Sequence, residues 1–364
     1  MNQSAQRPCH PDDAAVRVPT EGGPDIVVSL TRMPPEWTRH ERTLMSWPVL
    51  RSLWGDAFED AKDEYAATAR VVARFEPVTL VVRPGDEADA ARRCGPRVDI
   101  VSLPIDDSWM RDSGPAIVFD PRGSRAGIQF RFDAYGGRFP HANDARVATR
   151  VLDHLGIPFR RSSMTFEGGA VTVDGEGALI ATKQCLLRSN RNRGWSRERV
   201  ESELRAHFAV RRFVWLPWGR AEDMHTDGHV DFVCMFVRPG AVVAQGCADI
   251  ANPNHARMRA NLRTLRRATD AQGRALEVVE LPMSPLVDCH GTPVMVSHLN
   301  FYLCNNAVIV PLAETADDAR ALAVIARALP EREVVGVPAR ALALGGGGVH
   351  CITQQVPACT VVSP

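Results

Sequence analysis

One pattern recurs five times along this chain of 364 residues: a short apolar strand, an amphipathic helix and a second apolar strand. Successive copies lie roughly 60–70 residues apart, and a repeat of this period constrains the architecture more than any single motif does. A strand–helix–strand unit buries its apolar faces by packing the helix against the two strands. The repetition therefore predicts an α/β protein.

The first strand of each copy is predicted at 43–48, 115–119, 178–182, 241–245 and 307–311. The helices are predicted over 57–75, 142–155, 196–208, 254–269 and 317–329, and their apolar residues recur at spacings of three and four. The second strands are predicted at 78–82, near Phe159, and at 210–216, 276–281 and 334–337. Five such units closing in a ring predict an α/β propeller around one central cavity. A single open α/β sheet would show the same alternation. We favour the ring because the polar motifs described below fall at equivalent places in several units.

The charge balance gives no argument for an anionic partner. Lys plus Arg and Asp plus Glu each number 43, so the formal net charge is zero. The most basic stretches, 188–199 and 257–267, contain interleaved apolar or aromatic residues and are interpreted as solvated helix faces. No apolar run reaches transmembrane length. We therefore expect no nucleic acid and no membrane as partner, and the sequence leaves the oligomeric state open, a homo-oligomer included.

The nine cysteines are scattered, form no CxxC pair and are odd in number, which is typical of reduced thiols rather than of a disulfide framework. Residues 1–27 are polar and contain no apolar signal-peptide core. We expect a cytoplasmic protein in which residues 1–27 form a flexible tail and residues 28–362 form a single catalytic domain.

Cys351 stands in the segment GGGGVHCITQQ, residues 345–355. Four glycines give the backbone conformational freedom and let a ligand approach without obstruction by a Cβ atom. A nucleophilic thiol needs such room, together with electropositive surroundings that lower its pKa. The segment alone favours a catalytic cysteine over a buried structural one.

The segment HTDGHVD, residues 225–231, leads into an apolar strand. In an extended chain alternate side chains share a face, so His225, Asp227, His229 and Asp231 are expected to line one side. An HxxxH pair with an Asp is also a candidate zinc site. This spacing serves a metal best on a helix, and Gly228 with the β-branched residues around it argues against one. We expect no metal.

Two further motifs open neighbouring copies of the repeat. DDSWMRDSGP, residues 106–115, sets Trp109 and Asp112 just before an apolar strand, although an exposed acidic turn would also fit this composition. Glu167 lies in FEGGA, residues 166–170, which by itself is most often a simple turn. An aromatic face beside carboxylates suits a planar cation. The glycine run lacks the Lys-Ser/Thr of a P-loop and the spacing of a dinucleotide motif. A cysteine protease would need one orienting Asn or Asp rather than several acids. A thiol, an imidazole and several carboxylates point instead to nucleophilic attack on a guanidinium.

These residues resemble the guanidino-group-modifying enzymes of the pentein fold, and specifically the agmatine deiminase family. The likeness extends over nearly the whole chain, from Met33 to Gln355. The motifs that carry it are MPPEW, WP (47–48), DDSWMRDSGP, FEGGA, TDGHVD, CMFVRPG, LNFYLCNNAVIVP and GGGGVHCITQQ. The resemblance implies a five-bladed pentein α/β propeller, in agreement with the five repeats.

The resemblance also implies roles for individual residues. Cys351 would be the nucleophile and His229 the general acid and base, while Asp112 and Asp231 would bind the guanidinium nitrogens. Glu167 would hydrogen-bond to the histidine and orient it. Trp109 would stack near the guanidinium plane. Trp47, His225, Asp227 and Gly347 are further expected to contact the substrate.

The implied reaction is deimination without a cofactor. Attack by Cys351 and loss of ammonia would leave a covalent thiouronium, which water would hydrolyse to a ureido product, N-carbamoylputrescine if the substrate is agmatine. The expected substrate is therefore a small cationic guanidino compound. The family usually has Glu where this chain has His225 and Asn where it has Asp227, so another guanidine such as arginine, peptidyl-arginine or a guanidino acid remains an alternative. Two other classes stay open, an amidinotransferase and a non-catalytic pentein protein such as a ribosome anti-association factor.

Overall fold

The computed structural model describes residues 15–20, 23–29 and 31–359. Within the N-terminal segment 1–27, which was expected to be a flexible tail, strand β1 (Ala15–Thr20) pairs antiparallel with β2 (Gly23–Ser29). Residues 1–14, 21 and 22 of that segment, and residues 360–362 at the end of the expected domain, lie outside the described residues. The segment thus contains a hairpin that the sequence did not predict.

The first copy of the repeat forms a four-stranded sheet in the order β20-β3-β4-β5. Its three consecutive strands are parallel, and the C-terminal strand runs antiparallel beside the first of them. The strands are β3 (His40–Ser46), β4 (Val78–Val82), β5 (Val98–Ser102) and β20 (Thr353–Pro357). The helical segments between them are α1 (Arg51–Trp54), η2 (Gly55–Ala57), α2 (Phe58–Val72) and α3 (Glu87–Cys94).

The other four copies form three-stranded sheets of one design. In each, an antiparallel strand is followed by two parallel strands that a helix connects. The strands are β6 (Ala116–Phe119), β7 (Arg125–Arg131) and β8 (Phe159–Thr165); β9 (Val171–Val173), β10 (Ala178–Thr182) and β11 (Arg212–Leu216); β12 (Cys234–Arg238), β13 (Ala241–Gly246) and β14 (Glu277–Pro282); and β17 (Tyr302–Cys304), β18 (Ala307–Leu312) and β19 (Glu333–Pro338). The connecting helices are α6 (Val147–His154), α8 (Arg197–Phe208), α9 (Asn254–Leu265) and α10 (Asp317–Ala328).

Short elements join these sheets. They are α4 (Met110–Ser113), α5 (Ala134–Gly137), η3 (Asp144–Arg146), η4 (Gly168–Ala170), α7 (Lys183–Leu186), η5 (Val230–Phe232), the hairpin β15 (Val287–Cys289) and β16 (Thr292–Val294), and α11 (Arg340–Leu344). Most of them precede a sheet rather than cross over one. They hold many of the polar residues that the sequence singled out.

The predicted strands and helices agree with the observed ones in four of the copies, and the second copy needs a correction. There, the sequence predicts 115–119 as the strand before the crossover helix, but these residues form β6, the antiparallel strand. The strand that the helix follows is β7, which the sequence analysis missed, and it pairs parallel with β8. The helix expected over 142–155 is shorter, because η3 occupies its first turn.

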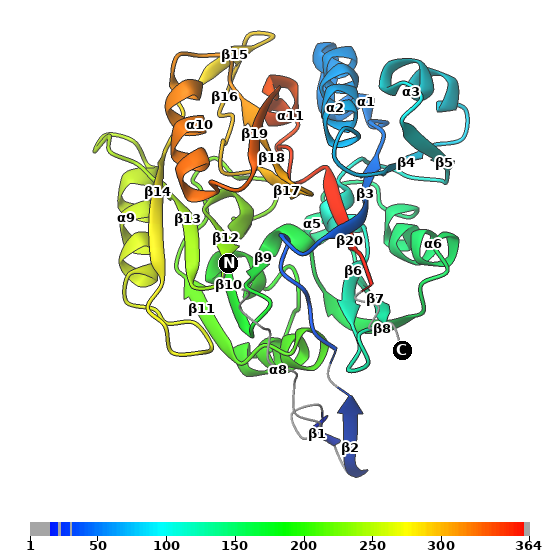
Figure 1. Cartoon of the computed structure of the whole chain (residues 1–364), viewed down its shortest axis with the longest axis vertical. Coiled ribbons are helices and arrows are strands. Elements are labelled where there is room, and N and C mark those ends of the chain that lie inside the picture. The colour runs from blue at the N-terminus through cyan, green and yellow to red at the C-terminus, as the bar shows by residue number, and fades with distance from the viewer. Residues whose placement is uncertain (1–14, 21–22, 30, 360–364) are drawn as a thin grey trace.

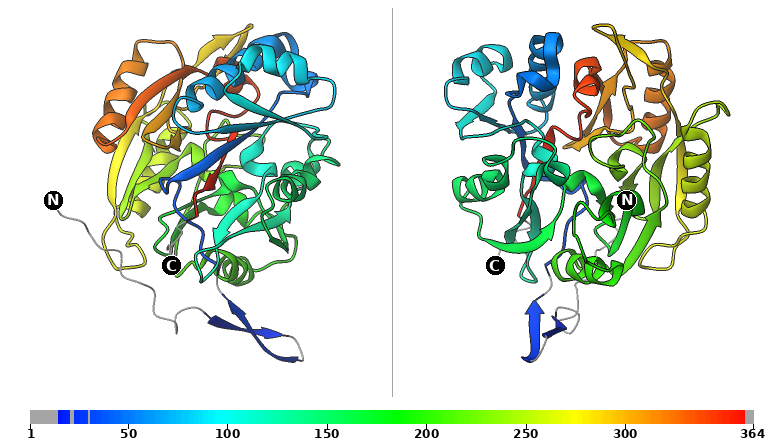
Figure 2. Two further views of the ribbon diagram at one scale, coloured as in Figure 1. Left: turned by 45° about the vertical axis from the view of Figure 1, so that its right-hand side comes forward. Right: turned by 180° about the vertical axis from the view of Figure 1, so that it is seen from behind.

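The connecting helices lie on the outside of the molecule and the sheets lie inside it (Figures 1 and 2). This arrangement explains why β4, β10 and β13 are buried along their whole length and are composed of apolar residues almost throughout. A mixed α/β architecture is therefore confirmed.

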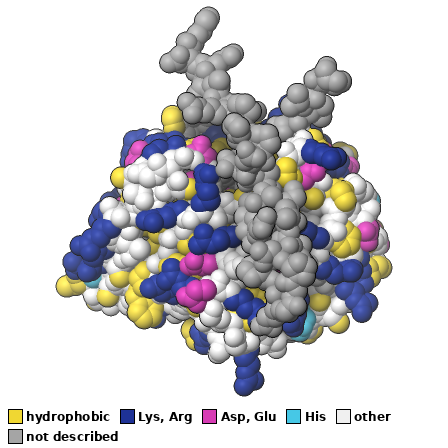
Figure 3. Space-filling view, turned by 90° about the horizontal axis from the view of Figure 1, so that it is seen from below, with side chains coloured by type: hydrophobic (Ala, Val, Ile, Leu, Met, Phe, Trp, Pro, Cys, Tyr) yellow, Lys and Arg dark blue, Asp and Glu magenta, His cyan; other side chains and the backbone are white. Residues whose placement is uncertain are grey.

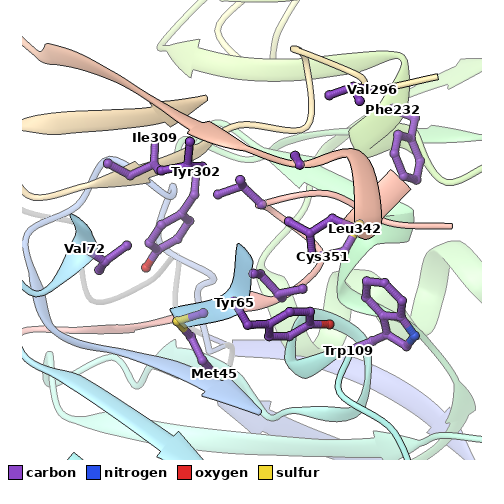
Figure 4. Packing of buried hydrophobic residues seen from close by; sticks show 14 of the residues in the cluster. Met45, Tyr65, Val72, Trp109, Phe232, Val296, Tyr302, Ile309, Leu342 and Cys351 are labelled. Atoms are coloured by element: carbon purple, nitrogen blue, oxygen red, sulfur yellow. The ribbon is translucent and has the colours of Figure 1, made fainter. Parts of the chain in front are cut away.

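The C-terminal strand brings the catalytic candidate into the interior. In β20, Thr353 pairs with Met45 and Gln354 with Leu44 of β3, and the residues just before β20, 349–352, are buried. Figure 4 shows Cys351 there, among buried side chains that include Trp109, Leu342 and Tyr302. The thiol thus sits where segments far apart in the sequence meet.

The exposed charges are mixed. On the face seen in Figure 3, Lys and Arg side chains are spread widely, with acidic side chains beside some of them. On α8, for example, Arg197 and Arg205 both pair with Glu201, at 2.8 and 3.1 Å. No helix among the described residues is long and apolar enough to cross a membrane.

Replacing Leu44 with Ala should lower the free energy of unfolding by about 2–5 kcal/mol, because Leu44 is 0% exposed and the smaller side chain leaves a cavity in the apolar cluster that Leu44 forms with Met110 and Val356. Leu286→Ala, at a position 58% exposed, is the matched control and should change stability by about 0.5 kcal/mol or less. Denaturant unfolding measures both, and equal effects would contradict the packing described for β3.

Candidate active site

Cys351 lies between α11 and β20 and is 3% exposed. Its Sγ is 3.6 Å from Oδ2 of Asp231 and 3.4 Å from Oδ1 of Asn300. The backbone N–H of Cys351 also donates to that amide oxygen, at 3.3 Å. The thiol is therefore held by two polar side chains from distant parts of the chain.

The glycines before Cys351 are required by the close approach of protein side chains, whereas the sequence analysis predicted room for a ligand. A Cβ atom at Gly347 would lie 2.1 Å from Cζ3 of Trp109, and one at Gly346, where φ is +90°, would lie 2.4 Å from Nδ1 of His225. Both contacts are shorter than any side chain tolerates. The glycine turn thus lets two aromatic rings pack directly on the backbone next to the thiol.

Two carboxylates approach the thiol from different sheets. Asp112, on α4, accepts hydrogen bonds from the Gly169 N–H and the Tyr135 hydroxyl, both at 2.9 Å. Asp231, in η5, contacts Nδ1 of His350 at 2.8 Å through Oδ2, while its buried Oδ1 has no partner among the described residues. A buried, unpaired carboxylate oxygen is costly unless a ligand supplies a donor.

His229 and Glu167 are both 0% exposed. Nδ1 of His229 is 3.9 Å from Oδ1 of Asp112 and Nε2 is 3.7 Å from Oε2 of Glu167, which are ion-pair distances longer than hydrogen bonds. Oε1 of Glu167 accepts a hydrogen bond from Nε of Arg191 at 2.6 Å. A Cβ at Gly169 would lie 2.6 Å from Nδ1 of His229 and 2.8 Å from Oδ2 of Asp231, so these groups converge on one glycine.

Burial and mutual charge shift the pKa values of these groups. Burial raises the pKa of the Cys351 thiol well above its usual range, and the nearby Asp231 and Asp112 raise it further. Burial acts to lower the pKa of His229, but the charge of Asp112, with Cys185 and Glu167, outweighs it and raises that pKa well above its usual value. Burial likewise opposes ionisation of Asp231, yet the pKa of this carboxyl is lowered, chiefly by His350. In the ligand-free site the thiol is therefore protonated, His229 is charged and Asp231 is ionised.

The five polar residues occupy equivalent places in the five sheets. Each lies a few residues before the antiparallel strand: Asp112 before β6, Glu167 before β9, Asp231 before β12, Asn300 before β17 and Cys351 before β20. The short segments that precede these five strands thus carry the thiol, the amide and the three carboxylates.

A narrow pocket of ≈ 280 Å³ opens onto this cluster. Of the predicted site residues, Cys351, Asp112, Trp109, His225 and Gly347 line it. His229, Asp231 and Glu167 are not part of that lining. Asp231 contacts Cys351, His229 lies beside Asp112, and Glu167 lies beside His229. The ring of Trp109 packs on that of Trp54, with centroids 5.7 Å apart.

Two predicted contact residues are not part of the pocket lining. Trp47 is 0% exposed and belongs to the hydrophobic core. The carboxylate of Asp227 binds arginines instead: Arg138 at 2.7 and 2.9 Å, Arg191 at 2.9 Å and Arg188 at 3.0 Å. Burial acts to raise the pKa of Asp227, but hydrogen bonds from Arg138 and Asn190 and the charge of Arg191 lower it far below its usual value.

The expectation that residues 225–231 form an extended strand was wrong. The φ values of Asp227 and Gly228 are +64° and +97°, which reverse the chain and turn Asp227 away from its neighbours. The strand begins only at Cys234. His229 and Asp231 reach the site because η5 follows the reversal directly.

Sequence reasoning missed several residues that support the site. Arg191, in a stretch interpreted as a solvated helix face, has a fully buried side chain that binds Glu167 and Asp227, and α8 begins only at Arg197. His350 was overlooked although it adjoins Cys351. Asn300 lay within a quoted motif without a role of its own. Tyr135 gave no signal in the sequence.

Three buried donors could together hold a metal ion, although the sequence predicted none: Glu167, Cys185 and His229 have ligand atoms within 4.8 Å of one another. This set differs from the HxxxH pair considered for His225 and His229. The guanidinium of Arg191 lies 2.6 Å from the same Glu167 carboxylate and opposes a second cation there.

Comparison with known proteins gives concordant matches. The family model for Porphyromonas-type peptidyl-arginine deiminase matches residues 32–357. A Streptomyces coelicolor protein, provisionally named an agmatine deiminase, is 45% identical over 90% of this chain and 98% of its own length. The agmatine deiminase of Pseudomonas aeruginosa is 40% identical over 90% of this chain and 95% of its own. The solved structure of agmatine deiminase from Enterococcus faecalis is 29% identical, covers 91% of this chain and 96% of its own, and superimposes with a TM-score of 0.86.

Replacing Asp231 with Asn should increase the rate of Cys351 alkylation by iodoacetamide at a fixed pH near 8 by about tenfold, because removal of a neighbouring negative charge lowers the pKa of the thiol. Peptide mass spectrometry resolves Cys351 from the other cysteines. The control Asp270→Asn makes the same charge change at a carboxylate paired with Arg274 and should leave the rate unchanged. Slower alkylation in Asp231→Asn would contradict the electrostatics of the site.

Proposed function

Because the chain belongs to the Porphyromonas-type peptidyl-arginine deiminase family, we propose that it is a hydrolase of linear amidines. It converts the guanidino group of agmatine, or of a closely related small guanidino compound, to a ureido group and releases ammonia. The observation that carries this proposal is the meeting of Cys351 with Asp112, Asp231 and His229 in one buried cluster. A buried thiol among carboxylates favours a cationic carbon as its target.

Asp112 and Asp231 bind the guanidinium. Its planar N–H groups fit carboxylate oxygens, and Oδ1 of Asp231 is buried and has no other partner among the described residues. Holding the planar cation between two carboxylates aligns its carbon with Sγ of Cys351 and converts a bimolecular attack into a local one. Trp109, in the wall of the pocket, offers a ring face to the cation.

The substrate helps to ionise its own nucleophile. Without substrate, burial together with the charges of Asp231 and Asp112 holds the thiol in its protonated form. A bound guanidinium neutralises much of their effect, so the pKa of Cys351 falls when the substrate is present. The thiol releases its proton to solvent, since His229 is already protonated, and the thiolate adds to the guanidinium carbon to give a neutral tetrahedral adduct.

His229 carries the protons of both half-reactions. Its raised pKa keeps it protonated at neutral pH, so it can donate a proton to the departing nitrogen, which leaves as ammonia. The neutral imidazole then takes a proton from water, which attacks the thiouronium carbon and releases the ureido product and Cys351. Glu167, 3.7 Å from Nε2, stabilises the charged imidazole by an ion pair.

We propose that the five sheets are the blades of a pentein α/β propeller formed by a single catalytic domain over residues 28–362. The repeated strand order, the equivalent placement of five polar residues and the pairing of β20 with β3 support this arrangement. A cytoplasmic location is part of the same proposal. It is supported by the cysteines among the described residues, which are free thiols.

Cys351→Ala should lower kcat for ureido formation by about a thousandfold or more, because no other described thiol lies beside the two carboxylates. Cys304→Ala, at a buried thiol of β17, is the matched control and should retain activity. The assay follows ammonia without any added amine acceptor, which separates a deiminase from an amidinotransferase. Undiminished activity in Cys351→Ala would refute the mechanism.

Glu167→Gln should move the basic limb of the kcat/KM–pH profile to lower pH. The charge of Glu167 contributes to the raised pKa of His229, so its removal lets the imidazole lose its proton at lower pH. Glu203→Gln is the control, since Glu203 pairs with His207 at 3.1 Å on the outer helix α8. An unchanged limb, or one displaced to higher pH, would contradict the role given to His229.

A further inference from the structure

The pocket has two ends of different character. Cys351 and Asp112 mark the reacting end, and Phe139, His225 and Thr226, which we call the tail end, form another part of its lining. His225 packs with its ring edge to face on Phe139, with centroids 5.5 Å apart, and against the backbone of Gly346. Asp112 is the only carboxylate among the described lining residues, and it lies at the reacting end.

Most polar groups at the tail end are already committed. The Thr226 hydroxyl donates to Asp223. The N–H groups of Gly346 and Gly347 donate to the carbonyls of Ala343 and Leu342, both at 3.0 Å. The imidazole of His225 makes no hydrogen bond within the part of the chain that the structure describes. His225 is therefore the side chain at this end that is free to bind a distal group of the substrate.

Arginine side chains lie beside the tail end. Three guanidinium groups, of Arg138, Arg188 and Arg191, surround the single carboxylate of Asp227. Glu167 balances one of them, and the carboxylate of Asp223, which accepts from the Thr226 hydroxyl, also adjoins the tail end. Arg138 donates to the backbone carbonyl of His225 at 2.6 Å, so its guanidinium directly adjoins the tail end. An ammonium group there would meet no counter-ion among the lining residues.

We infer, on the basis of the proposed function, that His225 determines the specificity for the distal group and that the site takes guanidino carboxylates as well as agmatine. A carboxylate tail can accept a hydrogen bond from the imidazole and is stabilised by the nearby arginines. A charge-assisted hydrogen bond of this kind is stronger than a neutral one. A protonated amine can use only the lone pair of a neutral imidazole, and it is repelled by the arginines.

The test compares kcat/KM for agmatine and for 4-guanidinobutyrate, which carry opposite charges on similar chains. In the wild-type protein, 4-guanidinobutyrate should be at least as good a substrate as agmatine. His225→Glu should change the ratio in favour of agmatine by about tenfold or more, the effect of one charged interaction of roughly 1.4 kcal/mol. The change should appear mainly in KM, since His225 lies away from the reacting atoms.

A second variant guards against misfolding of the first. Arg188→Gln removes one partly exposed charge of the cluster and should lower kcat/KM for 4-guanidinobutyrate several-fold while that for agmatine stays equal or rises. Arg205→Gln is the matched control, because the side chain of Arg205 is 45% exposed and that of Arg188 is 48% exposed. It should leave the ratio of kcat/KM for the two substrates unchanged. The circular dichroism spectrum of each variant verifies folding.

The outcomes separate the two proposals. No ammonia release from either compound by folded wild-type protein would refute the deiminase function itself. A second outcome would leave the deiminase function intact and overturn the inference about the tail end. In it, the wild-type protein hydrolyses agmatine efficiently and its kcat/KM for 4-guanidinobutyrate is more than about tenfold lower. In addition, neither Arg188→Gln nor folded His225→Glu changes the ratio of the two kcat/KM values.

Discussion

The site depends on a buried chain of alternating charges behind the thiol. Asp231, which contacts Cys351, is paired with Nδ1 of His350 at 2.8 Å, and Nε2 of His350 is paired with Glu36 at 2.9 Å. Arg111 completes the chain, 3.3 Å from Glu36. Two carboxylates and two cations compensate each other, so their burial is tolerated where a lone charge would not be. Because each group comes from a different segment, this compensation also ties the chain around Glu36, α4, η5 and the C-terminal turn together.

The same chain fixes the protonation states on which the chemistry rests. His350 keeps the pKa of Asp231 low in spite of burial, so the carboxylate beside the thiol is ionised and ready for a cation. Burial and that charge together hold the free thiol in its protonated, unreactive form. A bound guanidinium compensates the charge of Asp231 and at the same time lowers the pKa of Cys351. The reactivity of Cys351 is thereby coupled to the presence of a substrate of the correct charge.

The sequence predicted what local periodicity determines. Apolar runs located β4, β10, β13 and β18 closely, because a buried strand must be apolar throughout, and the spacing of three and four located α8, α9 and α10. Sequence analysis failed where contacts between residues far apart in the chain determine the structure. Arg191 is buried because Glu167 and Asp227 bind it, and no local pattern announces such partners. Asp227 leaves the pocket because of a positive φ that only the folded chain reveals. The residues of the reacting end were found from motifs, whereas the supporting Asn300, His350 and Arg191 were missed.

The central claim is that Cys351 becomes covalently bonded to the substrate carbon. Acid quenching during steady-state turnover of agmatine, followed by peptide mass spectrometry, tests it most directly. We predict an adduct of the mass of the thiouronium intermediate on the peptide that contains Cys351, and its absence when agmatine is left out. Turnover with no adduct on Cys351, or with the adduct on another cysteine such as Cys185, would contradict the account.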